Sequence, residues 1–289
     1  MKRFACRLFI LFSMVPLLTG CFGLITTLSP SLIPGFTETF FEECDPELAR
    51  IALPADLKLM EGLLKNDPTN RQLLTALCMG FTGYVMLFIE DENPERASQL
   101  YLRARDYGLE ALGRNGDFLR TSSPSMEKVR TSLKRFGEKE IEALFCTTLS
   151  WLAWLNLNID KPAALAQMGA AQSCLERVLE IKPTHFYAAP YVLMGTILGA
   201  KPGAAGGDAD QARLYFEKAM EISQGQFYFV QYHYAKYYAV RVQNKELFVQ
   251  LIQEIIDGQP DRLSTVCLIN SVMKQKAKKL LAMSEDLFF

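Results

Sequence analysis

Side chains that could perform catalysis are few and scattered in this 289-residue chain. Its two histidines, His185 and His233, lie far apart, and neither belongs to a motif that pairs a general base with a nucleophile or with metal ligands. The glycine-rich run 203–207 lacks the Gly-Lys-Ser/Thr sequence that holds a nucleotide phosphate, so we expect a turn that ends at Asp208 as a helix N-cap. The acidic run 90–92 is predicted to be a solvated helix edge. The sequence therefore predicts no enzyme, no metal site and no cofactor.

Two aromatic clusters are better candidates for binding. Trp151 and Trp154, the two tryptophans of the chain, lie three residues apart on one predicted helix face, with Asn158 a turn further on. The second cluster surrounds His233 and comprises Phe227, Tyr228, Phe229, Tyr232, Tyr234, Tyr237 and Tyr238. One helix cannot bury so many aromatic side chains in a single seam, so we expect one face to line a groove, a pore or a partner surface. The alternative is packing between repeats, with tyrosine hydroxyls reaching solvent.

From these clusters and one neighbouring helix we select seven candidate ligand- or partner-binding residues. They are Trp151, Trp154, Asn158, Tyr191, Tyr232, His233 and Tyr237.

The elements that must position these residues are all predicted to be helices. Apolar residues recur at helical spacing from Asp45 onward, and no pair of alternating strands joined by a hairpin turn is present. Pro54, Pro94 and Pro162 each precede an apolar run, as expected of proline at a first helical position. The predicted helices span 54–65, 70–90, 94–113, 124–136, 138–159, 162–181, 185–199, 208–223, 226–243, 245–257 and 262–285.

A spacing of plus four and then plus three residues recurs in several of these helices, as in the second helix of a tetratricopeptide repeat. The triplets are Ala97-Tyr101-Ala104, Ala171-Leu175-Val178, Ala212-Phe216-Ala219 and Phe248-Ile252-Ile255. Tyr191, Met194 and Gly195 occupy first-helix positions of one unit. Because the same spacing marks any amphipathic helix, the pattern alone leaves open whether the fold is a tetratricopeptide-like α-solenoid.

Charge and composition narrow the classes of partner. The chain is 49% hydrophobic and has a formal charge of −1, which is typical of an ordinary folded protein. Without a basic excess or an aromatic-plus-basic RNA motif, a nucleic-acid partner is not predicted. Lys274, Lys276, Lys278 and Lys279 form a basic stripe near the end of the chain, which could face anionic lipid, an acidic partner or water.

The N-terminus predicts export and a lipid anchor. A basic start precedes the apolar run 8–18 and then the sequence Leu18-Thr19-Gly20-Cys21, which resembles the lipobox of bacterial lipoproteins. We therefore expect a signal peptide over 1–20, acylation of Cys21, a tether over 21–44 and a helical-repeat domain over 45–289. The alternative is an uncleaved membrane anchor, since no charge occurs between Arg7 and Glu38, although prolines and glycines interrupt that stretch.

The remaining cysteines show no paired spacing. Cys44, Cys78, Cys146, Cys174 and Cys267 include no Cys-x-x-Cys, so neither a zinc site nor a disulfide scaffold is indicated. The last four lie among apolar residues at helical spacing and are expected to be small buried hydrophobes. In an oxidising compartment one disulfide could form, and the sequence does not say which cysteines would form it.

Taken in order, several segments resemble the T-component family of TRAP transporters. They are 52–64, the run 100–112 (LYLRARDYGLEAL), the tryptophan run 150–158, the Gly206-Gly207-Asp208 loop and the C-terminal segments 279–281 and 285–288. The resemblance covers nearly all of the chain after the signal peptide. The basic stripe is a departure from it.

The resemblance implies a non-enzymatic periplasmic lipoprotein built on tetratricopeptide repeats. Such a protein would act as a scaffold for the periplasmic solute-binding protein of a TRAP uptake system, and it could form a homo-oligomer. The alternative that the residues leave open is a ligand carrier, whose aromatic helices line a pore or pocket for an apolar or carboxylate solute. The sequence does not distinguish the inner membrane from the outer membrane.

Overall fold

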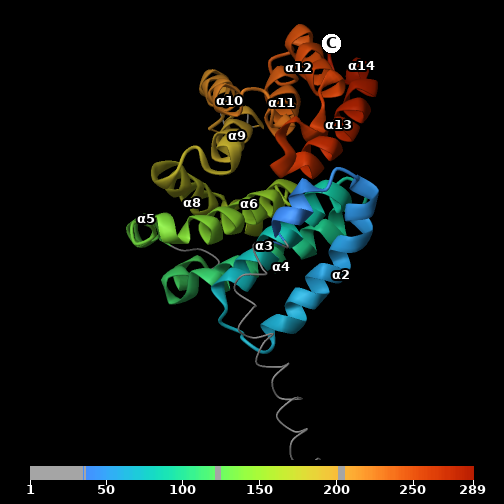
Figure 1. Ribbon diagram of the computed structural model, residues 1–289. Coiled ribbons are helices and arrows are strands. Elements are labelled where there is room, and N and C mark those ends of the chain that lie inside the picture. The colour runs from blue at the N-terminus through green and yellow to red at the C-terminus, as the bar shows by residue number, and fades with distance from the viewer. Residues whose placement is uncertain (1–34, 36, 121–124, 201–205) are drawn as a thin grey trace, which may run out of the picture.

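The computed structural model describes residues 35 and 37–289, apart from 121–124 and 201–205, so the predicted signal peptide and Cys21 lie outside the described residues. All regular structure in the described part is helical (Figure 1). The first half comprises α2 (Pro46–Leu64), α3 (Arg71–Tyr84), η1 (Val85–Ile89), α4 (Pro94–Leu112), η2 (Gly113–Arg120), α5 (Met126–Leu133), η3 (Glu138–Glu140) and α6 (Ile141–Leu157). The second comprises α7 (Pro162–Leu165), α8 (Met168–Ile181), α9 (His185–Ala200), α10 (Ala209–Ser223), α11 (Tyr228–His233), η5 (Tyr234–Ala239), α12 (Lys245–Asp257), η6 (Pro260–Val266), α13 (Cys267–Ala282) and α14 (Ser284–Leu287).

Side-chain caps explain where many of these helices begin. Asn70, Asn93 and Asn244 each accept a hydrogen bond from the backbone N–H three residues on, and Asp208 does the same for α10, as predicted. Pro94 and Pro162 occupy the first helical positions, which confirms their assignment.

The prediction for Pro54 was wrong, because Pro54 lies inside α2. That helix begins eight residues earlier, at Pro46. The carboxylate of Asp45 caps it by accepting from the N–H groups of Glu47 and Leu48.

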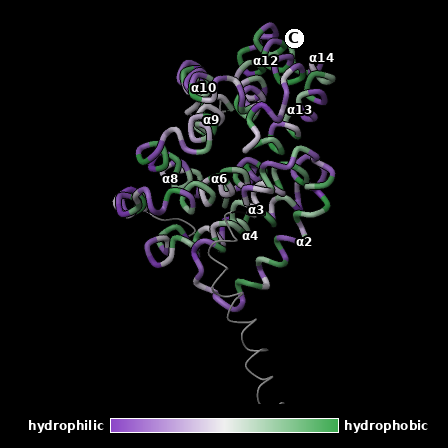
Figure 2. The backbone as a smooth tube through the Cα atoms, viewed as in Figure 1, coloured by the Kyte–Doolittle hydropathy of each residue, from purple (hydrophilic) through white to green (hydrophobic). Residues whose placement is uncertain are grey.

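The helices pack as successive pairs, which confirms the repeat fold. In each pair a first helix packs against a second: α3 with η1 against α4, α6 against α8, α9 against α10, and α11 with η5 against α12. Every member of the four predicted triplets on the second helices is 0% exposed. In Figure 2 hydrophilic residues are prominent along α10, on the outside, whereas α6 is buried on most of its surface. The small residues of the triplets therefore let neighbouring helices approach closely.

The N-terminal helix and the C-terminal helix meet. Figure 1 shows the start of α2 beside α13, and these two helices are in contact. A disulfide joins Cys44 to Cys267 across 223 residues, so Cys267 is not the free buried cysteine that its apolar neighbours suggested. Cys78, Cys146 and Cys174 are buried free thiols, as expected.

The segment before α2 is packed as well. Residues 37–42 are helical. Phe41 is buried and contacts the ring of Phe186, with 5.7 Å between the centroids. The described end of the predicted tether therefore belongs to the folded body.

A left-handed turn redirects the chain between α8 and the regular part of α9. Phe186, Tyr187 and Ala188 have φ values of 43°, 56° and 67°, which are costly for residues with a Cβ. The hydroxyl of Tyr187 lies 2.5 Å from that of Thr265 and ties the turn to η6. Pro190 lies two residues after Ala188 and so stands in the first turn of the right-handed helix, where its missing N–H leaves no hydrogen bond unmade.

One helical stretch in the described part, Arg71–Ile89, is long and apolar enough to cross a membrane. However, 67% of its apolar window is buried inside the protein, as is usual for a core helix.

Two of the four lysines in the predicted basic stripe are engaged within the protein. Lys276 forms an ion pair with Asp91 at 2.5 Å, and Lys274 donates to the carbonyl of Gly258 at 2.8 Å. Lys278 and Lys279 are exposed. The stripe is therefore less available to a partner than its sequence suggests.

Candidate functional site

The first helices of the four pairs, together with Met168 of α8, line an open cavity of about 250 Å³. Its wall is mostly apolar and includes Met86, Leu149, Leu152, Leu193, Ile197 and Phe229. Asn156, Ile159 and Ala200 also line it and are exposed, so they mark its mouth. Because each wall comes from a different repeat, the cavity exists only when the repeats stack. A concave, mainly apolar cavity with a few polar groups is the usual form of a small-molecule site.

Five polar side chains line this cavity: Glu90, Asn156, Thr196, His233 and Tyr237. Glu90 directly follows η1. His233 directly precedes η5, and Tyr237 lies within it. Both η1 and η5 are π-helical, and such widened turns occur frequently at functional sites. Two separate repeats therefore carry the same backbone irregularity at the point where they supply polar groups to the cavity.

His233 is a neutral hydrogen-bond acceptor in this site. Its Nδ1 lies 2.9 Å from the carbonyl oxygen of Phe229, and since a carbonyl only accepts, Nδ1 carries the proton. Burial lowers the pKa of His233 to about 3, because the imidazolium form would lose its hydration. The neutral ring then leaves Nε2 with a lone pair. Its ring also packs against Phe229, with 3.9 Å between the centroids.

The negative charge of Glu90 acts on the phenol of Tyr237. The hydroxyl of Tyr101, which is fully buried on α4, donates to the carboxylate of Glu90. Burial, and next the negative charge of Glu90, raise the pKa of Tyr237 to about 12, so this phenol stays protonated. The hydroxyl oxygen of Thr196 is buried without a hydrogen-bond partner among the described residues. Such an atom costs free energy unless a bound molecule or water satisfies it.

A second, smaller cavity of about 40 Å³ adjoins the first and shares Met86, Leu149 and Phe229 with it. Its lining is apolar and includes Phe41 and Phe186. The packed segment before α2 therefore closes one end of the hollow region.

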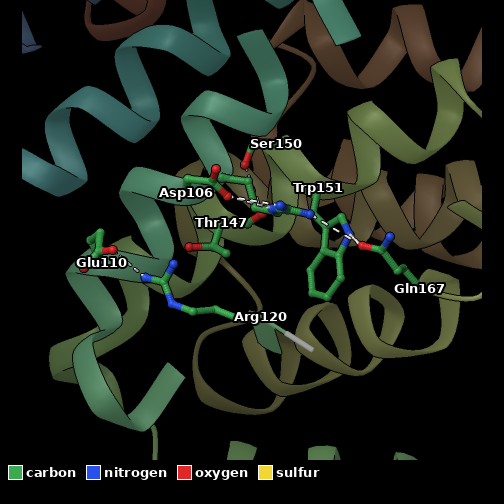
Figure 3. A network of polar contacts seen from close by, with 8 residues as sticks. Asp106, Glu110, Arg120, Thr147, Ser150, Trp151 and Gln167 are labelled. Carbon is green, nitrogen blue, oxygen red and sulfur yellow. Dashed lines mark hydrogen bonds and ion pairs between the residues drawn. The ribbon is translucent and has the colours of Figure 1, made fainter. Parts of the chain in front are cut away.

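The tryptophan cluster serves packing. The indole of Trp151 is 0% exposed, and its Nε1 donates to the side-chain oxygen of Gln167 at 3.1 Å (Figure 3). Arg105 lies over the Trp151 ring, 5.7 Å from its centroid, and forms an ion pair with Asp106 at 3.0 Å. Trp154 is partly buried against the core. Neither tryptophan lines the cavity.

Three other candidates also have partners elsewhere in the fold. Asn158 is buried, donates to the hydroxyl of Ser98 at 2.9 Å and accepts from Lys161 at 2.7 Å. Tyr191 packs on Tyr215, with 5.8 Å between the ring centroids. Tyr232 is buried beside His233 but does not line the cavity. Of the seven candidates, the structure brings His233 and Tyr237 to the cavity.

Sequence reasoning missed Glu90, Thr196 and Asn156. The acidic run 90–92 was expected to be solvated, and this holds for Glu92, which pairs with Arg50 at the surface at 2.6 Å. Glu90 differs because η1 turns its side chain toward the cavity. The available signal was its position at the end of the uncharged run 72–89, where an acid is unusual unless it is used.

Among the residues that the structure describes, no group of three or more His, Cys, Asp and Glu side chains could hold a metal ion.

Comparison with known proteins identifies the family of this chain. A protein from Treponema pallidum (strain Nichols), named only as an uncharacterized protein, is 23% identical over 269 residues, which cover 88% of this chain and 83% of that protein. The family model described as "TRAP transporter T-component" matches residues 42–288, which include every helix from α2 to α14. This is a family of transporter accessory proteins of the periplasm and is not an enzyme family. The chain therefore belongs to the TRAP transporter T-component family.

Proposed function

We propose that this protein is a lipid-anchored scaffold for the periplasmic solute-binding protein of a TRAP uptake system. Family membership is the observation that carries the proposal. A stacked-repeat architecture supports it, since solenoids use the extended surface formed by one set of their helices to bind partners. We place the docking surface on the first helices α6, α9 and α11, around the mouth of the cavity. No step of this role needs a catalytic group.

The anchor is a separate part of the proposal. Cys21 in the lipobox-like sequence would be acylated after removal of residues 1–20, and residues 21–36 would link the lipid to the folded body. Replacing Cys21 by Ala should then release the protein from membranes and abolish labelling with a fatty-acid analogue. A Cys21→Ala protein that stays in the membrane would contradict the anchor.

The docking role is tested by cross-linking intact cells, solubilising the membranes in mild detergent and isolating this protein. The proposal predicts that a periplasmic solute-binding protein is recovered in near-equal amount. Recovery of this protein alone, from cells that express the solute-binding protein, would contradict the scaffold. The mass of the cross-linked species also tests for a homo-oligomer, for which the exposed Leu48, Ile51 and Leu59 on α2 offer an apolar contact.

A ligand carrier is the second candidate, and the cavity favours it. In that case the protein receives a solute from its partner or holds one for it. Replacing His233 and Tyr237 together by Ala should then reduce ligand binding and leave docking intact. Loss of docking with retained ligand binding would instead favour the scaffold alone.

A further inference from the structure

We propose that the cavity binds a small organic amine, whose apolar body fills the hollow and whose ammonium group is held by Glu90. The inference rests on the carrier function, the second candidate above, and it names the ligand class. It is independent of the scaffold function. It also differs from the carboxylate solute that the sequence left open.

Two polar groups of the cavity, Glu90 and His233, offer only hydrogen-bond acceptors and therefore call for a donor. One carboxylate oxygen of Glu90 accepts from Tyr101, and the other has no partner within the described residues. His233 offers Nε2 as a second acceptor, since its Nδ1 proton is committed to Phe229. The hydroxyl of Thr196 is buried and unpartnered there as well. The Thr196 hydroxyl can donate or accept, so it pairs with either kind of ligand. A ligand that brings N–H donors satisfies all three groups, whereas one that brings only acceptors leaves Glu90 and His233 unpaired.

The charges around the cavity favour the same ligand. Its lining contains one carboxylate, Glu90, and neither lysine nor arginine. Of the cations nearby, Lys276 is paired with Asp91 at 2.5 Å, and Lys236 lies over the rings of Tyr232 and Tyr237, 5.7 and 5.3 Å from their centroids, outside the lining. A carboxylate ligand would therefore meet Glu90 without a compensating cation, and an ammonium ion would find its counter-charge.

The volume of the cavity and its aromatic lining determine which apolar group the ligand can carry. A volume of about 250 Å³ is below the range of about 300–1,000 Å³ typical of drug-sized ligands, so the ligand is small. Phe229 and Tyr237 supply aromatic faces, which attract a cation through the ring quadrupole. A one-ring or short-chain amine meets these requirements.

The test uses two probes with the same apolar body, 2-phenylethylamine and 3-phenylpropanoate, with titration calorimetry on the purified full-length protein in detergent at neutral pH. We expect the amine to bind and the carboxylate not to bind at the same concentration. Glu90→Gln should weaken amine binding at least tenfold. Glu95→Gln is the matched control, because it removes the same charge from an exposed position outside the cavity and should leave the affinity unchanged.

A second variant keeps the test decisive if Glu90→Gln perturbs the fold. Ala153 lines the cavity, so Ala153→Leu should fill part of it and abolish amine binding in a protein with an unchanged helical spectrum. Equal binding of both probes, no binding of the amine to the folded wild type, or an affinity unaffected by both variants would overturn the inference. The cross-linking experiment on the scaffold would be unchanged by any of these results.

Discussion

The two aromatic clusters of this protein look alike in sequence and have different surroundings in the structure. The indole of Trp151 is fully enclosed, and Gln167 satisfies its N–H. His233 and Tyr237 line a hollow, and the Nε2 atom of His233 has no protein partner within the described residues. The clusters differ at two polar atoms: the indole N–H of Trp151 is paired with Gln167, whereas Nε2 of His233 has no partner inside the described fold. A satisfied atom indicates packing, and an unsatisfied one beside a cavity indicates a binding surface.

The largest loss of stability is expected from a substitution in the packed tryptophan cluster. Trp151→Ala should lower the free energy of unfolding by about 3–5 kcal/mol, because it removes a buried indole and leaves a void. Tyr237→Ala should cost about 1 kcal/mol, since this ring already borders a cavity. Chemical denaturation of both variants measures the comparison. Equal losses would mean that the second cluster is also core packing.

Acid should destabilise the protein through its two histidines. Burial lowers the pKa to about 4 for His185 and about 3 for His233, below the unfolded value of about 6.5. Because the unfolded chain binds these protons first, their contribution is complete above about pH 6.5 and is lost as the pH falls toward 4. Between pH 7 and pH 5 we expect a loss on the order of 1–2 kcal/mol for each histidine.

Glu142, close to His185, acts in the opposite direction. Loss of hydration raises its pKa, and because its side chain is 62% exposed, its proton uptake on folding offsets only a small part of the loss. Unfolding curves at pH 7 and pH 5 for the wild type, His185→Phe and His233→Phe measure each contribution. A pH dependence that survives both substitutions would refute the assignment to these histidines.

Adding volume sharpens the comparison between packed and hollow regions. A Cβ at Gly108 would overlap the Thr147 hydroxyl and lie 2.9 Å from the sulfur of Cys78, so Gly108→Ala should cost about 1–3 kcal/mol. Ala153→Leu extends into the cavity and should be neutral or stabilising. Gly62→Ala, with no atom within 4 Å of the added Cβ, is the control and should stabilise α2 by about 0.5–1 kcal/mol. A tolerated Gly108→Ala would show that the α4–α6 contact is looser than described.

The smallest effect concerns one hydroxyl of the cavity. Tyr237→Phe keeps the ring and removes the oxygen that contacts Asn156, so it should change stability by less than about 1 kcal/mol. Thermal unfolding measures this change. A larger loss would place Tyr237 in a structural hydrogen-bond network.

Local patterns predicted the helices and the repeat because these depend on nearby residues. The triplets such as Ala212-Phe216-Ala219 are buried as their spacing requires, and Asp208 caps α10. The prediction that a helix begins at Pro54 was wrong because a proline followed by an apolar run has the pattern of a helix start. An earlier start at Asp45 and Pro46 was equally consistent with local rules.

Features that join distant segments were beyond the sequence. The disulfide between Cys44 and Cys267 depends on how the repeats curve, and no local spacing encodes that curvature. Glu90 belongs to the candidate site only because η1 and η5 bring two separate repeats to one cavity. His233 and Tyr237 were found since an excess of aromatic side chains is visible in one helix.

Hydrogen–deuterium exchange of the purified protein, with and without its solute-binding protein, tests most directly whether the cavity side is the working surface. We predict that the partner slows exchange where α6, α9 and α11 with η5 border the cavity mouth, with α8 and α10 unchanged. Protection confined to α8 and α10 would contradict the account.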